Sequence, residues 1–403
     1  MNYEIHEVDF SYRDSIFGQV RYGNYEPTGI IILNDGSIVI STKFSIDFPE
    51  QFQQTDSYTK EYFKMQKEYS EKSHISSGSV FMLDANFEKK WGVIFKERRV
   101  THVRKLQDET IIVLGESTDM KFFWIAKVDK EGSVVFEKRY RFKSSPSIAN
   151  VEVDSLDNLY ILVTTEKILP IKITNHLSKR RIRFFKETTM ESDVYILKVS
   201  PTGKIKWKTS IDTRRNYFSF GQAVVINKNI YISNYTEGYK REKTGWVEEA
   251  GNYIYTLNSR GKIKEIFQTK NKNILSLNKQ IIYSTHTDND SLVLYKKVFS
   301  SLKPFVTIVF NNKIKQFSID KALSTDLNNY IFGTTNHNLG CLLIELNSEN
   351  KYNGYWSYDN SNFVDAAIDS NKSIYILAKN YSNLNPNNSD NENFSVKLIK
   401  IKR

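Results

Sequence analysis

The chain has 403 residues, a formal net charge of +11 at pH 7, 13% aromatic residues and one cysteine. The aromatic and β-branched content excludes a disordered chain and favours strands over helices, and the single cysteine excludes a disulfide framework. No run of about 18 apolar residues is present, so no transmembrane span is predicted. The N-terminus, MNYEIHEVDFSYRD, lacks the apolar segment of a signal peptide, and we therefore expect a cytoplasmic protein.

In chain order, a strand-rich unit recurs about every 45 to 50 residues, a repeat length typical of four-stranded propeller blades. Each unit begins with two strands, and its second half is a hairpin with a short turn. The clearest hairpin, DVYILKVSPTGKIKWKTSID, spans 193–212, and its Gly203 is expected to supply a turn position with positive φ. The units begin near Thr28, Thr101, Ile148, Gln222, Ile274, Phe317 and Phe363.

The last unit predicts how the ring closes. It has three strands before Arg403, whereas an extra alternating stretch, Tyr3–Phe10, precedes the first unit. Pairing of that stretch with 394–402 would complete the last blade and remove two open sheet edges. We therefore predict an all-β fold in which residues 1–403 form a single seven-bladed β-propeller, closed by the N-terminal strand. The fifth unit is less regular, which leaves six or eight blades as alternatives.

The hairpin pattern, apolar-x-apolar-K-V-[SD]-x-x-G-x-[IV]-x-[WF], resembles the blade repeat of bacterial PQQ-like (quinoprotein-type) and SBBP-type propellers. The residues that carry this resemblance are Gly203 with Trp207, Gly132 with Phe136, Gly261 with Ile263, and Trp91 with Phe87 in place of the glycine. It covers nearly the whole chain and implies that Trp91, Phe136 and Trp207 pack between neighbouring blades. The sequence departs from the quinoprotein enzymes because it lacks their vicinal cysteine pair and acidic calcium loop, so the resemblance implies no PQQ cofactor.

Long insertions interrupt four of the units, each time between the second and third strands. They span 45–77, 165–192, 236–251 and 380–393. Because strand direction alternates within a blade, these connections are expected to emerge on one face of the disk, which we interpret as the binding face. Neutral variation in tolerant loops is the alternative explanation.

The insertions supply the candidate partner-binding residues. The first predicts an amphipathic helix that begins near Pro49 and carries Tyr62 in an aromatic stripe; it would either dock on the propeller or bind a partner. The second and third supply Arg180, Arg181, Arg183 and Phe185, and Tyr239, Arg241 and Trp246, respectively. Arginine beside aromatic residues is typical of protein interface hot spots and of phosphate contact with base stacking, and a solvated charged surface is the third interpretation. The fourth insertion, NYSNLNPNNSDNEN, predicts a polar loop.

No stretch of the sequence predicts a catalytic or metal site. His74, His176, His286 and His337 fall in second-to-third connections, but none has a metal-ligand spacing in sequence. Nucleophile elbow, P-loop, H-E-x-x-H and dinucleotide motifs are missing from the sequence. We therefore nominate no catalytic residue, metal or cofactor.

The leading hypothesis is a non-catalytic, monomeric propeller scaffold that binds a protein partner through the inserted loops, in an adaptor or neutralising, immunity-type role. The first alternative is an enzyme or small-ligand-binding propeller that uses the central channel. The inner strands TGIIIL, IANVEV and VDAAID look mostly small and apolar, which argues against convergent polar groups there. The second alternative is nucleic-acid binding through 165–192, which predicts a steep dependence on salt.

Overall fold

The computed structural model describes residues 2–8, 24–45, 77–168, 190–211, 218–226, 229–242, 245–269, 273–277, 280–287, 291–298, 301–310, 317–335, 340–380 and 395–402. Every regular element in these ranges is a β-strand. None of the described residues form a helix long and apolar enough to cross a membrane.

The described strands form seven antiparallel sheets of four strands each. The first sheet contains β2 (Asn24–Ile32), β3 (Ile38–Ser45), β4 (Gly78–Leu83) and β5 (Lys89–Phe95). The second contains β6 (Arg98–Lys105), β7 (Ile111–Ser117), β8 (Phe122–Val128) and β9 (Val134–Arg141). The third contains β10 (Ser145–Val153), β11 (Leu159–Ile168), β12 (Met190–Val199) and β13 (Ile205–Ile211).

The remaining sheets follow in chain order. The fourth contains β14 (Phe218–Ile226), β15 (Asn229–Glu242), β16 (Gly245–Leu257) and β17 (Ile263–Thr269). The fifth contains β18 (Asn273–Leu277), β19 (Gln280–Thr287), β20 (Ser291–Val298) and β21 (Ser301–Val309). The sixth contains β22 (Phe317–Ser324), β23 (Asn328–Thr335), β24 (Gly340–Asn347) and β25 (Tyr352–Tyr358). The last contains β26 (Ser361–Ile368), β27 (Ile374–Asn380), β28 (Ser395–Lys402) and β1 (Asn2–Val8).

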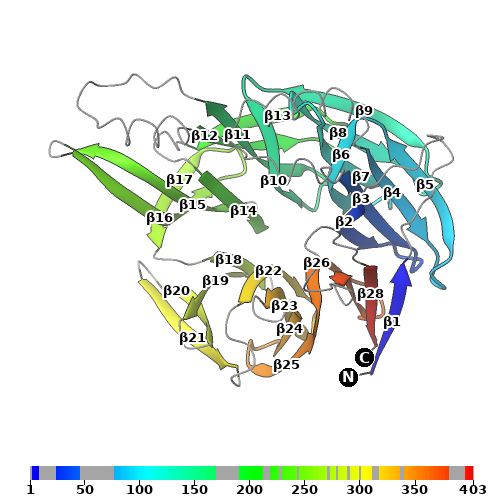
Figure 1. Ribbon diagram of the computed structural model, residues 1–403. Coiled ribbons are helices and arrows are strands. Elements are labelled where there is room, and N and C mark those ends of the chain that lie inside the picture. The colour runs from blue at the N-terminus through cyan, green and yellow to red at the C-terminus, as the bar shows by residue number, and fades with distance from the viewer. Residues whose placement is uncertain are drawn as a thin grey trace, which may run out of the picture.

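The sheets are arranged around a centre as the blades of a β-propeller (Figure 1), which confirms the predicted all-β propeller class. The first strand of each sheet is the innermost, and each of these strands contacts the inner strands of the two neighbouring sheets, so that the ring is complete. Every blade is therefore covered on both of its faces, which explains why strands such as β7 are buried throughout.

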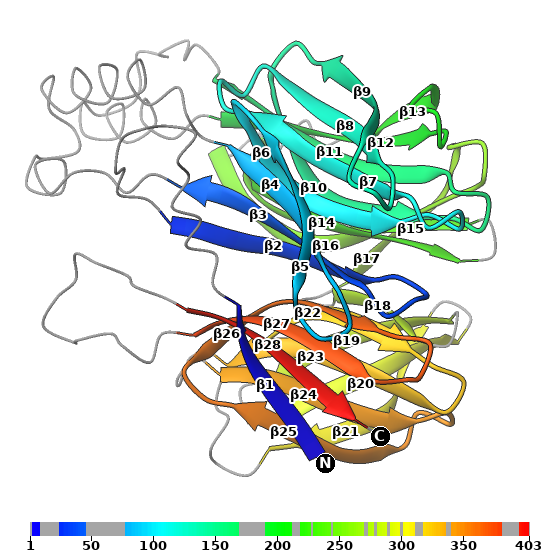
Figure 2. The ribbon, with the colours of Figure 1, turned by 90° about the vertical axis from the view of Figure 1, so that its right-hand side faces the viewer.

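The N-terminal strand closes the ring as predicted. β1 pairs with β28 in antiparallel register from Asn2↔Lys402 to Val8↔Val396. Figure 2 shows β1 alongside β28, at the outer edge of the last sheet. Lys402 Nζ lies 2.5 Å from Glu4 Oε1 and adds an exposed ion pair to this closure.

Alternating residues of one strand contribute to two different cores. Val194 and Ile196 of β12 belong to the cluster shared with the fourth sheet, whereas Leu197 and Val199 belong to the cluster shared with the second sheet. All four side chains are fully buried. The alternation of apolar residues along the strand thus arises because the two faces of the blade pack against two different neighbouring blades.

Aromatic side chains of outer strands join successive blades. Trp91 Nε1 donates a hydrogen bond to the Lys130 carbonyl oxygen of the next blade over 2.8 Å, and Trp207 Nε1 donates to that of Ser259 over 3.1 Å. Between these two joints, the Phe136 ring lies 3.2 Å from the position that a Cβ on Gly203 would take. The predicted interblade packing of Trp91, Phe136 and Trp207 is confirmed.

The structure corrects the boundaries of the predicted insertions. Residues 165–168 and 190–192 belong to β11 and β12, and 236–242 and 245–251 belong to β15 and β16, which are one continuous hairpin and not an inserted loop. The predicted helix near Pro49 lies outside the described residues, as do the predicted polar loop and the bulk of the second insertion.

Candidate functional site

A two-stranded ribbon extends beyond the fourth sheet. β14 pairs with β15 up to Glu237, and β17 pairs with β16 only from Asn252 onward. Beyond these points β15 and β16 pair only with each other, from Gly238↔Glu249 to Glu242↔Gly245. Figure 1 shows this hairpin reaching out from the body of the disk. We call residues 238–249 the ribbon.

Three of the predicted partner-binding residues lie on the ribbon. Arg241 and Trp246 are Cα partners, directly opposite each other across the two strands. Tyr239 lies two residues before Arg241 on β15, so all three residues occupy the same face of the ribbon by register. These three positions of the third predicted insertion are therefore neighbours in the strand register of the ribbon.

The other predicted partner-binding residues lie outside the described residues. They are Tyr62 in the first insertion, and Arg180, Arg181, Arg183 and Phe185 in the second. The strands that flank the second insertion are described, and they pair as far as Ile168↔Met190. These flanking strands belong to the blade next to the one that carries the ribbon.

A second candidate site lies at the centre of the ring, where five inner strands carry a bulge at the same place. The register shifts between Pro27 and Gly29, Val100 and His102, Ile148 and Asn150, Ile319 and Lys321, and Phe363 and Asp365. A bulge redirects the side chain that follows it. The residues after the bulge are Gly29, His102, Asn150, Lys321 and Asp365.

Asp365 ties three inner strands together at this level. Its Oδ1 accepts hydrogen bonds from Lys321 Nζ over 2.5 Å and from the Ala366 amide over 2.9 Å, and its Oδ2 accepts one from the Ile30 amide over 3.0 Å. Lys321 Nζ also donates to the Ala366 carbonyl oxygen over 2.7 Å. The lysine side chain is 26% exposed and that of Asp365 is 12% exposed, so the lysine has more access to solvent than its partner. Gly29 lies beside Asp365, and a Cβ there would be 3.4 Å from Asp365 Oδ2, an ordinary contact distance.

Arg104 and Glu152 lie two residues further along their strands than His102 and Asn150. Arg104 Nε donates to the Val151 carbonyl oxygen over 2.9 Å, and Nη1 donates to that of Val103 over 2.8 Å. Burial raises the pKa of Glu152, although the positive charges of Arg104 and Lys321 oppose the shift. We call Arg104, Asn150, Glu152, Lys321 and Asp365 the channel cluster.

His102 is a neutral member of the same wall. Burial, reinforced by the positive charge of Arg104, lowers the pKa of His102 to about 3. Its Nδ1 lies 3.0 Å from Thr101 Oγ1. At neutral pH this imidazole therefore contributes hydrogen-bonding capacity without charge. In the part of the chain that the structure describes, no group of His, Cys, Asp and Glu side chains could hold a metal ion.

The channel cluster corrects the prediction that the inner strands lack convergent polar groups. That prediction considered TGIIIL, IANVEV and VDAAID, and it gave little weight to Glu152 and Asp365 within them. It also left aside the inner strands that carry Arg104 and Lys321. Charged residues from β6, β10, β22 and β26 in fact meet at the centre of the ring.

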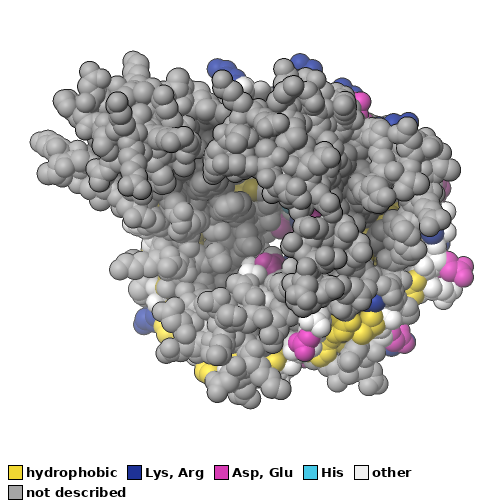
Figure 3. Space-filling view, in the orientation of Figure 1, with side chains coloured by type: hydrophobic (Ala, Val, Ile, Leu, Met, Phe, Trp, Pro, Cys, Tyr) yellow, Lys and Arg dark blue, Asp and Glu magenta, His cyan; other side chains and the backbone are white. Residues whose placement is uncertain are grey.

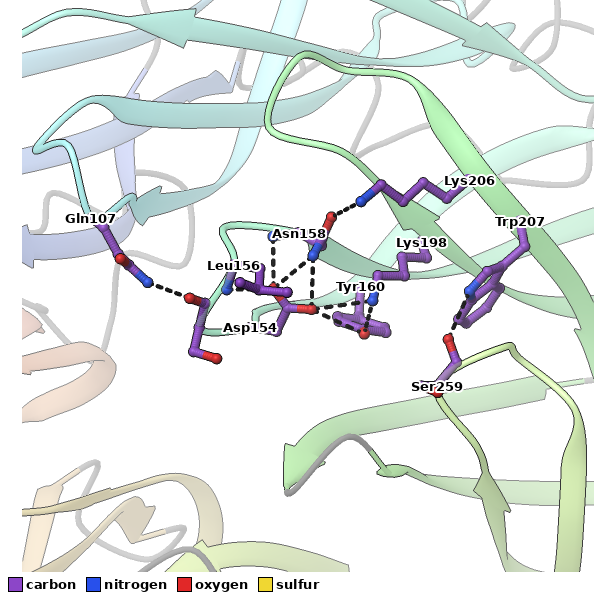
Figure 4. Close-up of polar contacts among 10 residues, drawn as sticks. Gln107, Asp154, Leu156, Asn158, Tyr160, Lys198, Lys206, Trp207 and Ser259 are labelled. Atoms are coloured by element: carbon purple, nitrogen blue, oxygen red, sulfur yellow. Dashed lines mark hydrogen bonds and ion pairs between the residues drawn. The ribbon is translucent and has the colours of Figure 1, made fainter.

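A further polar network, on the face opposite the ribbon's connection, is structural (Figure 4). Asp154 Oδ1 accepts hydrogen bonds from the Leu156 and Asn158 amides, each over 2.9 Å, and its Oδ2 lies 3.2 Å from Lys198 Nζ and 3.1 Å from Tyr160 Oη. The side chains of this network bond to one another and to backbone amides, so we interpret the network as structural. The last blade repeats the arrangement, with Tyr375 Oη 3.3 Å from Asp369 Oδ2 and Lys400 over the Tyr375 ring.

Exposed cations gather on the outer strands of the second and third blades. Figure 3 shows Lys and Arg side chains along the edge of the disk where Figure 1 places β9 and β13. They include Lys138, Arg139, Arg141, Lys206 and Lys208, which we call the basic rim. The one acid of these two strands is Glu137. This sector is adjacent to the blade that carries the ribbon.

Comparisons with known proteins show the fold alone. No family model matches the chain, and no curated protein matches it. Among solved structures, the Dos1 propeller has a TM-score of 0.51 at 9% identity, covering 95% of this chain and 94% of that one. A chain in the crystal structure of the Mitotic Checkpoint Complex has a TM-score of 0.51 at 6% identity, covering 99% of this chain and 91% of that one.

Proposed function

We propose that this protein is a non-catalytic propeller scaffold that binds a protein partner through the ribbon and the neighbouring insertions. The observation that carries the proposal is the placement of Tyr239, Arg241 and Trp246 on one face of a two-stranded extension. Aromatic residues and arginine are the residue types that dominate protein interfaces. A two-stranded hairpin is also only marginally stable in water by itself, and a bound partner would stabilise it.

The partner would be acidic and would cover the blades nearest the ribbon. The basic rim lies on the two blades that precede the ribbon in the ring. In the chain, the second insertion, with Arg180, Arg181, Arg183 and Phe185, lies between β11 and β12 of the third blade. Positive charge in one sector steers an acidic partner to that sector. A chain of the same fold occurs in a protein assembly, the Mitotic Checkpoint Complex, which is compatible with this role. The same proposal includes a monomeric state, a relationship to bacterial PQQ-like propellers, and an adaptor or neutralising role.

The test is affinity capture of the tagged protein from lysate of its own host, compared with a variant in which residues 238–249 are replaced by Asn-Gly. Because Glu237 and Ala250 are Cα partners, the short turn closes the hairpin at the last position where β14 still pairs with β15. We expect the free energy of unfolding to change by less than about 0.5 kcal/mol. A protein retained in stoichiometric amount by the full chain should be lost by the variant.

Two further variants provide a control on the opposite face and a second test of the binding surface. Leu156→Ser changes an exposed apolar residue, 74% accessible, on the opposite face, and it should retain the partner. Joint replacement of Arg180, Arg181 and Arg183 by Ala should weaken retention without unfolding the protein. Retention of the same protein by the variant without the ribbon would contradict the proposal, as would the lack of any stoichiometric protein on the full chain.

A further inference from the structure

The centre of the ring is a second candidate site, distinct from the ribbon. Figure 3 shows the disk hollowed at its centre, with acidic side chains at the wall of the hollow. Arg104, Glu152 and Lys321 are each partly exposed there, although they lie on the innermost strands. Charged groups with restricted access to water interact more strongly with a ligand than the same groups on an open surface.

Lys321 and Asp365 already neutralise each other. Asp365 accepts three hydrogen bonds, from Lys321 and from two backbone amides, and both side chains bridge inner strands. This pair therefore belongs to the architecture of the ring and leaves little net charge for a ligand.

Arg104 has a different environment. Two of its N–H groups bind the carbonyl oxygens of Val103 and Val151, and a guanidinium has five N–H donors. Among the described side chains, no carboxylate makes an ion pair with Arg104. The inner strands β14 and β18, with sequences FSFGQAVVI and NILSL, contain no acidic residue that could supply one. Arg104 is therefore fixed in place by the backbone. The charge of Glu152 acts on it, but no described carboxylate is hydrogen-bonded to its remaining N–H groups.

The side-chain oxygen of Asn150 lacks a hydrogen-bond donor. Its Oδ1 atom is buried and has no hydrogen-bond partner. It precedes Val151, whose carbonyl oxygen holds Arg104, and it lies two residues before Glu152 on the same strand face. A buried acceptor without a donor destabilises the protein, whereas a ligand with a donor group would satisfy it.

We propose that the channel cluster binds a small carboxylate that also carries a hydrogen-bond donor, as hydroxy acids and amino acids do. Arg104 receives the carboxylate, because its planar fork matches the two carboxylate oxygens. Asn150 Oδ1 accepts a hydrogen bond from the ligand's hydroxyl or amino group. Glu152 faces the same space and disfavours dianions such as phosphate. His102 lines the wall as an uncharged neighbour.

The test measures the unfolding temperature of the full chain against rising concentrations of glycolate, L-lactate, glycine and L-alanine. Acetate, phosphate and chloride at the same ionic strength are the comparison ions. Binding to the native state raises the unfolding temperature in a saturable way. We expect saturation with at least one hydroxy or amino acid, a weaker response to acetate, and none to phosphate or chloride.

Three variants assign the effect to the cluster. Arg104→Gln should weaken binding by at least about tenfold, since a charge-assisted pair is lost. Arg141→Gln, the same change on the basic rim, should bind like the unchanged protein. Asn150→Ala tests the site if Arg104→Gln does not fold, and it should respond to acetate and the hydroxy acids equally.

Three outcomes would overturn the proposal: no saturable response to any carboxylate, a response to phosphate alone, or equal binding by Arg104→Gln and Arg141→Gln. The variant that lacks residues 238–249 should bind the ligand normally. Loss of the partner without loss of the carboxylate response would therefore separate the two sites.

Discussion

Trp207 of β13 donates its indole hydrogen to the carbonyl oxygen of Ser259, which lies in the β16–β17 turn of the next blade. Gly261 of the same turn has φ +77°, and a Cβ on it would lie 2.7 Å from Trp207 Cε3. The ring of Trp207 also packs edge-on against Tyr160, at 6.0 Å between centroids. One aromatic side chain thus packs within the third blade and joins it to the fourth by a hydrogen bond and by a close approach that requires glycine.

Trp207→Ala is expected to lower the free energy of unfolding by about 3 kcal/mol, because removal of a packed indole leaves a cavity. Trp207→Phe should cost about 1 kcal/mol, because it removes the hydrogen bond and keeps most of the packing. Urea denaturation followed by circular dichroism measures both. Equal, small effects would show that this joint contributes little to the stability of the ring.

Gly261→Ala is expected to destabilise the protein by about 1–2 kcal/mol, since an alanine would have to adopt a left-handed conformation. Its methyl group would also collide with the Trp207 ring. Gly92→Ala is the matched control: Gly92 has no positive φ, and its nearest neighbour is the flexible end of Lys89, at 3.3 Å. Urea unfolding of both variants should show a loss for Gly261→Ala alone.

The repeated turns explain why the fold could be predicted. Gly132, Gly203 and Gly261 occupy corresponding turns, and all three have a positive φ. Each turn comes at the same distance from an alternating apolar strand, so local sequence is sufficient to identify the hairpin and its repeat. Phe87 occupies the glycine position of the first blade and has φ +68°, so it follows the backbone pattern without the residue that usually marks it.

The channel cluster could not be predicted by the same reasoning. A bulge breaks the simple alternation of an inner strand, so the residues that face the centre do not follow from hydrophobic pattern alone. The second strands nevertheless contain glycines that indicate where the inner strands bulge. A Cβ on Gly115 would lie 1.8 Å from the Arg99 carbonyl oxygen, and one on Gly333 would lie 1.9 Å from that of Ser318. Glycine within an otherwise apolar strand marks such a close backbone approach.

Residues 236–251, which include Gly238 and Gly251, were predicted as an insertion between the second and third strands of their unit. The structure continues both strands through these positions. Backbone pairing between adjacent strands overrides the weak strand preference of glycine, and sequence pattern does not report that pairing.

Deletion of residues 1–8 is expected to destabilise the whole ring. It would remove a strand paired along its full length with β28 and leave the last blade with three strands and an open edge. The expected result is one cooperative transition at a lower temperature, measured by calorimetry. An unchanged transition would show that the β1–β28 pairing does not hold the ring closed.

Cys341 is expected to report on unfolding of the ring. Its side chain is 1% exposed, and burial, with a smaller contribution from Asp320, raises the pKa of the thiol well above its ordinary value. A protonated, inaccessible thiol reacts slowly with disulfide reagents. Ellman's reagent should therefore label the native protein only at the rate of unfolding and label it at once in urea. Rapid labelling of the native protein would show local opening of the sixth blade.

Asp154→Asn is expected to destabilise the protein at neutral pH and to have little effect in acid. Burial would raise the pKa of Asp154, but hydrogen bonds from Asn158, Leu156 and Lys198 outweigh it and leave that pKa below its ordinary value. A carboxyl group whose pKa is lowered by folding contributes stability above its unfolded pKa, about 3.9, and this contribution is lost as the pH falls through the folded value. Urea unfolding at pH 7 should therefore separate Asp154→Asn from the unchanged protein, and the difference should narrow as the pH is lowered below the unfolded value. Asp326→Asn, an exposed site, should show no difference at either pH. A difference for Asp154→Asn that is the same at both pH values would mean that the shape of the carboxylate, and not its charge, holds the Asp154 network together.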